Sequence, residues 1–217
     1  MIKFHVGIMS ALLLTANPAN AEKTLARETS PLTYEIEGSI KQQHLLELIS
    51  TFNNKATDRP LRLILRNSYG LEKDSADLLM KFANWIDQSQ IELAVDGICV
   101  KACGLLFLSA HKKILLKSTN RPFSFVMLQA LVNDDDELDD ELNAYFKKLI
   151  QKNSEHRFPD FFFKKITQVE ESVGGILIAN SEERKNTNTI FSKGSPGKNK
   201  PEALDGYTLE KLGILNE

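Results

Sequence analysis

The residues with the clearest chemical potential lie in the stretch CVKACGLLF, which runs from Cys99 to Phe107. Two cysteines, Cys99 and Cys103, bracket Lys101, and the apolar segment IELAVDG, typical of a buried strand, comes just before them. Many hydrolases present their nucleophile at a sharp turn between a strand and a helix. Here the position that such a turn exposes carries a lysine in place of a serine. The stretch could therefore be an active site, a disabled one or neither.

The two cysteines are placed to form a disulfide. Residues four apart in one helical turn have Cα atoms about 6 Å apart, which lies within the range for a disulfide. A Cys99–Cys103 bond would close a very small loop, so it would fix local geometry more than it would restrict the unfolded chain. The alternative is two small apolar thiols that lie near each other. We expect neither a metal nor a cofactor, because no second pair of ligands accompanies the cysteines.

The lysine has two interpretations of its own. Lys101 could act as a base for Ser68 or Ser124, as in Ser–Lys hydrolases, which would require a desolvated ammonium with a lowered pKa. The simpler interpretation is a solvent-facing cation at a helix start, where the helix dipole makes it mildly unfavourable. The common motifs G-x-S-x-G, H-E-x-x-H and Walker A are absent from the sequence.

The N-terminus predicts export. Residues 1–21 combine a positively charged start, an uncharged apolar run and the A-x-A cleavage sequence ANA at 19–21, which are the parts of a secretory signal peptide. The apolar run is too short to span a membrane, and a buried N-terminal helix is the alternative. We expect a periplasmic or secreted mature chain that begins near Glu22, in a compartment where disulfides form.

Length and composition fit one globular domain. The chain has 217 residues, of which 42% are hydrophobic and 26% charged, enough to bury a core. Its formal net charge of −2 argues against a nucleic-acid-binding surface. Residues 22–32 are polar and predict a linker, and residues 33–217 predict the folded domain. After the signal peptide, no stretch is long and apolar enough to be an integral membrane segment.

Strands and helices are expected to alternate through this domain, which defines an α/β fold. Alternating or short apolar runs predict strands at 32–40, 61–68, 91–97, 112–116 and 122–131. Helical spacing of apolar residues predicts helices at 41–54, 73–90, 101–111, 133–156 and 158–170. The segment 183–202 predicts a loop, and Thr208 is the expected cap of a closing helix at 207–214.

The order of four motifs resembles a known superfamily. The motifs are NSYG at 67–70, CVKAC at 99–103, FSFV at 123–126 and the closing YTLEKLGI. In this order they resemble the exported, single-domain members of the Clp protease/crotonase-like superfamily. In those proteins a strand ends in N-S-x-G-G, C-x-S-A-C carries the serine nucleophile, and a later strand carries a histidine. The resemblance extends from about Tyr34 to Ile214 and implies an α/β fold with a spiral ββα core.

The sequence departs from this pattern where the chemistry would take place. Lys101 stands at the serine position, Val126 at the histidine position and Leu71 at the second glycine. The backbone amides of Gly70 and Ala102 could still form an oxyanion hole, because that depends on backbone geometry. Acyl transfer also needs a nucleophile and a base, and both are replaced. We therefore expect a catalytically inactive homologue of Clp-type serine peptidases.

The resemblance implies a binding function. The groove between the turn formed by Asn67, Ser68 and Tyr69 and the CVKAC turn would receive a peptide segment or a partner protein. The resemblance also implies homo-oligomers, often through the helix expected at 135–152, whose apolar stripe would face the core or a second subunit. That stripe consists of Leu138, Leu142, Phe146 and Leu149. The alternatives are an active hydrolase with a Ser–Lys arrangement around Lys101 and a structural, envelope-associated protein.

Overall fold

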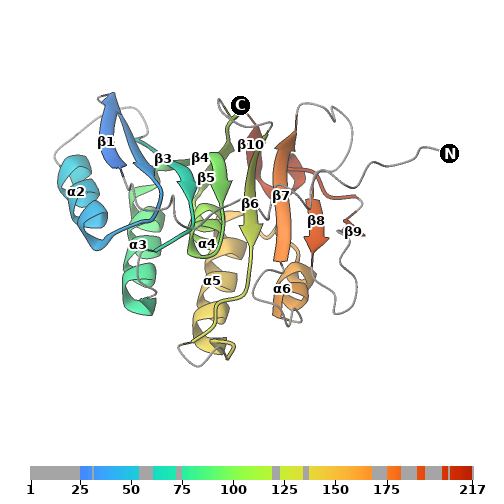
Figure 1. Ribbon diagram of the computed structural model, residues 1–217. Helices are drawn as coiled ribbons and strands as arrows, with labels where there is room; N and C mark the ends of the chain where they lie inside the picture. The colour runs from blue at the N-terminus through green and yellow to red at the C-terminus, as the bar shows by residue number, and fades with distance from the viewer. Residues whose placement is uncertain are drawn as a thin grey trace.

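A computed structural model of the chain describes residues 25–30, 32–53, 61–71, 75–118, 123–133, 137–167, 175–181, 190–193, 202–204 and 206–216. Strands and helices alternate and parallel strands form the centre of the sheet, so the predicted α/β class is confirmed (Figure 1). The signal peptide expected at 1–21 lies outside the described residues.

The strands of the described part of the chain belong to one sheet. They are β1 (Leu25–Ser30), β2 (Thr33–Glu37), β3 (Arg62–Ser68), β4 (Glu92–Cys99), β5 (Lys112–Leu115), β6 (Phe123–Leu128), β7 (Gly175–Ser181), β8 (Ile190–Lys193), β9 (Glu202–Ala203) and β10 (Ile214–Asn216). The helices are α2 (Gln42–Asn53), α3 (Ala76–Ser89), α4 (Ala102–Ser109), α5 (Asp140–Asn153), α6 (Asp160–Thr167) and the 3-10 helix η3 (Glu210–Leu212).

Three consecutive βαβ units form the first half of the domain. The helices α2, α3 and α4 each connect two strands that pair in parallel, namely β2 with β3, β3 with β4 and β4 with β5. Figure 1 shows α2 and α3 beside these early strands and α6 beside the later ones. The later strands β6 to β9 pair antiparallel with one another.

The sheet divides along β4. Residues 92–95 of β4 pair with β5, whereas Ile98 and Cys99 pair with β6. Between them, Gly97 has a φ of 83°, which a glycine adopts without steric cost. The hydroxyl of Ser124 in β6 accepts a hydrogen bond of 2.8 Å from the Gly97 N–H. This bend brings the end of β4, and the turn that follows it, against β6.

The two faces of the central strands differ in chemistry. Apolar residues on one face are fully buried in the core: Leu63, Leu65, Leu93 and Val95. On the other face, Arg66 forms ion pairs of 2.9 Å with Glu35 of β2 and with Asp96 of β4. Burial alone would raise the pKa of Glu92, but hydrogen bonds from Lys112 and Arg62, and their charges, lower it. Salt bridges thus join neighbouring strands across this face.

Side-chain hydroxyls accept backbone hydrogen bonds at the start of α3 and of the closing helix, where Thr208 was the predicted cap. The hydroxyl of Ser75 accepts a hydrogen bond of 3.3 Å from the Leu78 N–H, so Ser75 is the N-cap of α3. The hydroxyl of Thr208 accepts one of 3.2 Å from the Lys211 N–H, although the closing helix is a single 3-10 turn. Among the described residues, no helix combines the length and the apolar composition that crossing a membrane requires.

The predicted linker and the predicted loop both contain strands. Within 22–32, residues Leu25–Ser30 form β1, which pairs antiparallel with β2. Within 183–202, residues Ile190–Lys193 form β8 and pair with β7. The strand β7 was itself not predicted from the sequence. The strands β1 and β8 are short and lie toward the edges of the sheet, where a neighbouring strand supplies hydrogen bonds without demanding an apolar pattern.

The helix predicted at 135–152 begins later than expected. It starts at Asp140, because the carboxylate of Asp139 caps it by accepting a hydrogen bond of 2.9 Å from the Leu142 N–H. Leu138 instead forms an isolated antiparallel bridge with Val132 and is 40% exposed. The rest of the stripe is buried in the core of the same chain: Leu142, Phe146 and Leu149. The core alternative therefore holds for these three residues.

Candidate functional site

The turn between β4 and α4 consists of two residues, Val100 and Lys101. Lys101 has a φ of 55° and a ψ of −133°. These angles match the first central position of a type II′ turn, which glycine normally occupies. The side chain of Lys101 is exposed. A lysine thus occupies a glycine conformation at the corner of a strand–turn–helix, at a cost of about 1–3 kcal/mol.

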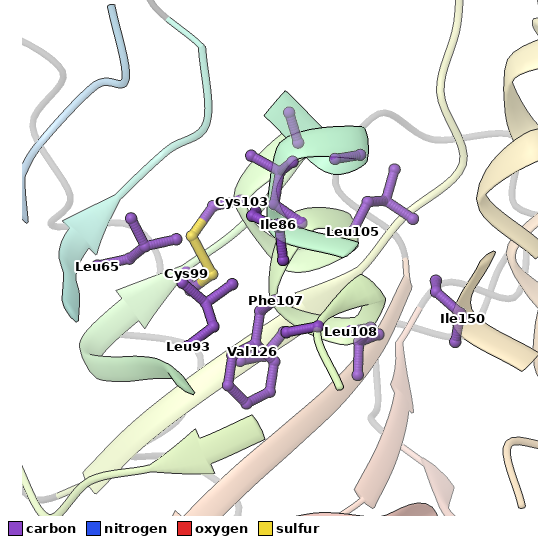
Figure 2. Packing of buried hydrophobic residues seen from close by; sticks show 14 of the residues in the cluster. Leu65, Ile86, Leu93, Cys99, Cys103, Leu105, Phe107, Leu108, Val126 and Ile150 are labelled. Atoms are coloured by element: carbon purple, nitrogen blue, oxygen red, sulfur yellow. A yellow bond between two sulfur atoms is a disulfide. The ribbon is translucent and has the colours of Figure 1, made fainter. Parts of the chain in front are cut away.

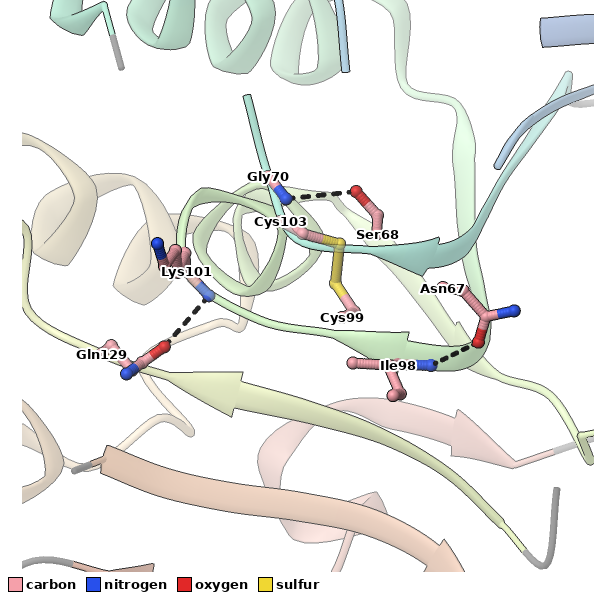
Figure 3. The surroundings of a disulfide bond; sticks show 8 residues. All are labelled: Asn67, Ser68, Gly70, Ile98, Cys99, Lys101, Cys103 and Gln129. Carbon is pink, nitrogen blue, oxygen red and sulfur yellow. Dashed lines mark hydrogen bonds between the residues drawn. A yellow bond between two sulfur atoms is a disulfide. The ribbon is translucent and has the colours of Figure 1, made fainter. Parts of the chain in front are cut away.

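The predicted disulfide spans this turn. Cys99 and Cys103 are bonded, their Cα atoms lie 5.3 Å apart, and both residues are fully buried. The bond joins the last residue of β4 to the first turn of α4, with Lys101 between them (Figure 3). The disulfide therefore restrains the turn directly, as predicted for a bond that closes so small a loop.

The helix that follows the turn is buried along its whole length. Figure 2 shows its side chains between Ile86 of α3 and Ile150 of α5. A Cβ atom on Gly104 would lie 2.2 Å from the carbonyl oxygen of Met127 in β6, so only glycine permits this approach of helix to strand. Close packing of α4 against β6 and its neighbours gives the turn a rigid base.

The two predicted turns lie side by side. The Val100 N–H donates a hydrogen bond of 3.1 Å to the carbonyl oxygen of Ser68. The side-chain oxygen of Asn67 accepts one of 3.4 Å from the Ile98 N–H. Ser68 is fully buried, whereas Asn67 and Tyr69 are partly exposed. The fold therefore brings the NSYG turn and the CVKAC turn together, and the groove expected between them stays a prediction.

The two predicted oxyanion positions are neighbours, but one amide is engaged. A Cβ atom on Gly70 would lie 3.0 Å from both the Cβ and the backbone nitrogen of Ala102. However, the Gly70 N–H donates a hydrogen bond of 3.3 Å to the hydroxyl of Ser68 (Figure 3). While this bond persists, the Gly70 amide is not offered to a ligand.

Val126 lies beside the last residue of β4. It pairs with Cys99 in the parallel ladder of β4 and β6 and is fully buried, and its Cγ1 would lie 3.4 Å from a Cβ atom on Gly104. The ladder ends at Cys99, because Val100 and Lys101 form the turn, so the register does not extend to Lys101. That Val126 stands at the position of a lost histidine stays a prediction.

The hydroxyls proposed as partners of Lys101 are buried and engaged. That of Ser68 accepts from the Gly70 N–H, and that of Ser124 accepts from the Gly97 N–H. Figure 3 shows the Lys101 ammonium pointing away from Ser68, with the disulfide between them. The structure does not bring a Ser–Lys pair together at this turn.

One residue of the site was missed in the sequence. The side-chain oxygen of Gln129 accepts a hydrogen bond of 3.1 Å from the Lys101 N–H (Figure 3). Gln129 comes directly after β6, whose end lies beside the turn. The contact joins residues 28 positions apart, so no local pattern reveals it. The strand predicted at 122–131 includes Gln129, but nothing in that pattern indicates that its side chain contacts the turn.

A cavity of about 740 Å³ lies away from this turn, between α2 and α3. Its apolar lining includes Leu45, Leu46, Ile49, Leu78 and Trp85. None of the residues of the two predicted turns lines it.

Comparisons with known proteins find matches among solved structures but none by sequence. No protein-family model and no curated protein matches this chain. ClpP1 from Listeria monocytogenes is 13% identical over 70% of this chain and 84% of its own, with a TM-score of 0.49. The ClpP protease catalytic domain from Plasmodium falciparum is 13% identical over 70% of this chain and 76% of its own, with a TM-score of 0.45. An enoyl-CoA hydratase from Mycobacterium smegmatis is 9% identical over 74% of this chain and 66% of its own, with a TM-score of 0.44.

Proposed function

We propose that this chain is an exported, catalytically inactive homologue of Clp-type serine peptidases that binds a peptide segment or a partner protein at the turn carrying Lys101. The conformation of Lys101, with φ 55° and ψ −133°, carries the proposal. Glycine would adopt it freely, whereas a residue with a side chain does so at a cost, and such residues concentrate at functional sites. At this position a lysine adds an exposed side chain, which a glycine would not. We infer that this side chain contacts the ligand.

The chemistry of the turn supports binding rather than acyl transfer. Acyl transfer needs a hydroxyl or thiol with a base in reach. Ser68 is buried and its hydroxyl is engaged, and the side chain that reaches the turn from the end of β6 is the amide of Gln129. An ammonium group, in contrast, donates three hydrogen bonds and suits the carbonyl and carboxylate oxygens of a polypeptide.

The export part of the proposal rests on two features. The N-terminal sequence has the parts of a signal peptide. The disulfide between Cys99 and Cys103 is of the kind that persists in oxidising compartments.

Peptide selection tests the binding function. Random 12-residue peptides displayed on phage are selected on the oxidised, exported protein, and their affinities are measured by fluorescence anisotropy. Lys101→Ala should weaken the selected peptides about tenfold or more, because a hydrogen bond to a charged group contributes about 1.5–3 kcal/mol. The matched control is Lys148→Ala, which removes an exposed lysine of α5. Peptides whose affinity is equal for both variants would contradict a binding role of Lys101.

A fluorophosphonate probe separates this function from its rivals, since the probe labels only an activated serine. We expect no labelling of the wild-type protein. Labelling that mass spectrometry assigns to one serine would overturn the inactive interpretation and favour an unconventional hydrolase. Absence of both labelling and Lys101-dependent peptides would favour a structural, envelope-associated protein.

A further inference from the structure

We propose that the Cys99–Cys103 disulfide and the strained backbone of Lys101 together form a redox-sensitive switch. In the oxidised protein the disulfide holds Lys101 in its glycine-like conformation, and reduction lets the turn relax. The consequence for ligand binding rests on the proposed function, because it assumes that the ligand contacts the Lys101 side chain. The switch itself is a property of the turn and can be tested without a ligand.

The disulfide is placed to act on Lys101. The loop that it closes encloses only Val100, Lys101 and Ala102. A crosslink around so few residues restricts the backbone angles of each of them. Lys101 is the enclosed residue with a positive φ, at 55°. Its conformation costs free energy that a negative φ would recover, so this turn gains from release.

The remaining restraints on the turn are weaker than a covalent bond. The Lys101 N–H donates to the side chain of Gln129 at 3.1 Å, and its carbonyl oxygen accepts from the Gly104 N–H at 3.0 Å. Lys101 occupies the N-cap position of α4, and within the described part of the chain its side chain makes no capping hydrogen bond there. Hydrogen bonds of this kind contribute about 1 kcal/mol each. The free energy of these hydrogen bonds is similar to that of the strain at Lys101, so the disulfide determines which conformation Lys101 adopts.

Reduction would follow thiol–disulfide exchange with a dithiol. Once local opening of the turn exposes the buried sulfurs, one thiolate of the dithiol attacks the sulfur of Cys99, the S–S bond breaks, and its electron pair leaves on Cys103. The second thiolate of the dithiol then displaces Cys99, so that two electrons and two protons pass to the cysteine pair and the dithiol becomes a disulfide. Cys103 is the favoured leaving group, because it lies in the first turn of α4, where the helix dipole stabilises a thiolate.

The switch predicts that strain at Lys101 makes the disulfide easier to reduce. The protein is equilibrated with mixtures of reduced and oxidised dithiothreitol, and alkylation with mass spectrometry gives the reduced fraction. In Lys101→Gly there is no strain to recover on reduction. Its disulfide should therefore be about tenfold harder to reduce than that of the wild type, which corresponds to about 30 mV for this two-electron couple.

Two control variants separate strain from other effects. Lys101→Ala removes the ammonium but keeps a Cβ atom at positive φ, so its disulfide should be as easy to reduce as that of the wild type. Val100→Gly adds glycine flexibility to the same loop without relieving Lys101, so it should not make reduction harder. Equal equilibria for wild type and Lys101→Gly would overturn the switch. So would a shift in either control that matches the shift in Lys101→Gly.

Hydrogen exchange tests the relaxation itself. On reduction of the wild-type protein, the amides of Ala102 to Leu105 should exchange faster, because the first turn of α4 loses its anchor to β4. Unchanged exchange after complete reduction would overturn the proposal. Neither experiment uses a peptide, so a failed peptide selection leaves both results standing, and a failed switch leaves the binding function untouched.

Discussion

The buried ammonium group of Lys113 lies where α4 and α5 end, and it gives a quantitative prediction about how stability depends on pH. The side chain of Lys113 is fully buried, and its ammonium donates hydrogen bonds to the carbonyl oxygens of Ala110 at 2.6 Å and of Asn153 at 2.9 Å. Ala110 is the C-cap of α4 and Asn153 the last residue of α5, so the cation meets the negative ends of two helices. Burial, aided by the charge of Arg157 and opposed by that of Glu155, lowers the pKa of Lys113 to about 8.

This pKa fixes the sign of a pH dependence. Between about pH 8 and pH 10.5 the folded protein has lost the proton of Lys113, whereas the unfolded chain retains it. Because the unfolded state binds more protons in this window, the free energy of unfolding rises with pH there. The change of the pKa from 10.5 to about 8, at about 1.4 kcal/mol per pH unit, gives about 3 kcal/mol. Below pH 8 the cost of burying the charge is present in full.

The perturbation is Lys113→Met, which removes the titrating group and keeps most of the side-chain length. Urea unfolding at pH 7.5, 9 and 10.5, with the disulfide intact, gives the free energy of unfolding of both proteins. From pH 7.5 to 10.5 the wild type should gain about 3 kcal/mol relative to the variant, since groups that titrate in both proteins cancel. Lys148→Met, at an exposed lysine, should show no such trend. A difference between wild type and Lys113→Met that stays constant with pH would refute the lowered pKa.

Three further predictions concern the turn, the helix behind it and export. Lys101→Gly should raise the free energy of unfolding of the oxidised protein, measured by urea unfolding, by about 1 kcal/mol. The reason is that relief of strain exceeds the entropic cost of glycine. An unchanged or lower stability would contradict the strain. Gly104→Ala should lower the free energy of unfolding by about 3 kcal/mol or more, because its Cβ would lie 2.2 Å from the carbonyl oxygen of Met127; a loss below about 1 kcal/mol would contradict this packing. The intact mass of the exported protein should lack the first 21 residues, and a mature product that keeps Met1 would contradict the signal peptide.

Elements with a strong internal pattern were predictable from the sequence. The apolar run of β4 ends at a polar residue between two cysteines, so the strand, the turn, the helix and the disulfide all have local signals. The strands β1, β8 and β9 lack such signals, because backbone pairing with a neighbour rather than apolar spacing holds them in the sheet. The strand β7 was missed although its apolar run GILIA is a strand signal.

The start of α5 shows how a distant contact overrides periodicity. The Leu131 N–H donates to the side-chain oxygen of Asn143 at 2.9 Å, and the Asn143 amide donates back to the Leu131 carbonyl at 2.8 Å. This exchange holds the chain before α5 in a bridge between Val132 and Leu138. Leu138 therefore lies outside the helix despite its helical spacing, and the exposure of its side chain could not be predicted from the sequence alone.

The position of a catalytic base depends on strand register, which the sequence did not determine. The segment FSFVML offers several residues that could face the turn, and a shift of two residues keeps the same face. The register is set by contacts outside the strand's own pattern. Ser124 accepts from the Gly97 N–H, and Met127 meets Gly104. With this register, Val126 pairs with Cys99.

This register makes a sharp prediction about restoring chemistry at the turn. Lys101→Ser combined with Gln129→His should react with a fluorophosphonate probe faster than Lys101→Ser combined with Val126→His, because the side chain at position 129 reaches the backbone of residue 101, whereas Val126 pairs with Cys99. Each single variant should stay unreactive, since a serine and its base act as a unit. Circular dichroism should show that both double variants are folded before their labelling rates are compared. Faster labelling of the variant with histidine at 126 would refute the register argument and return Val126 to the position next to the turn.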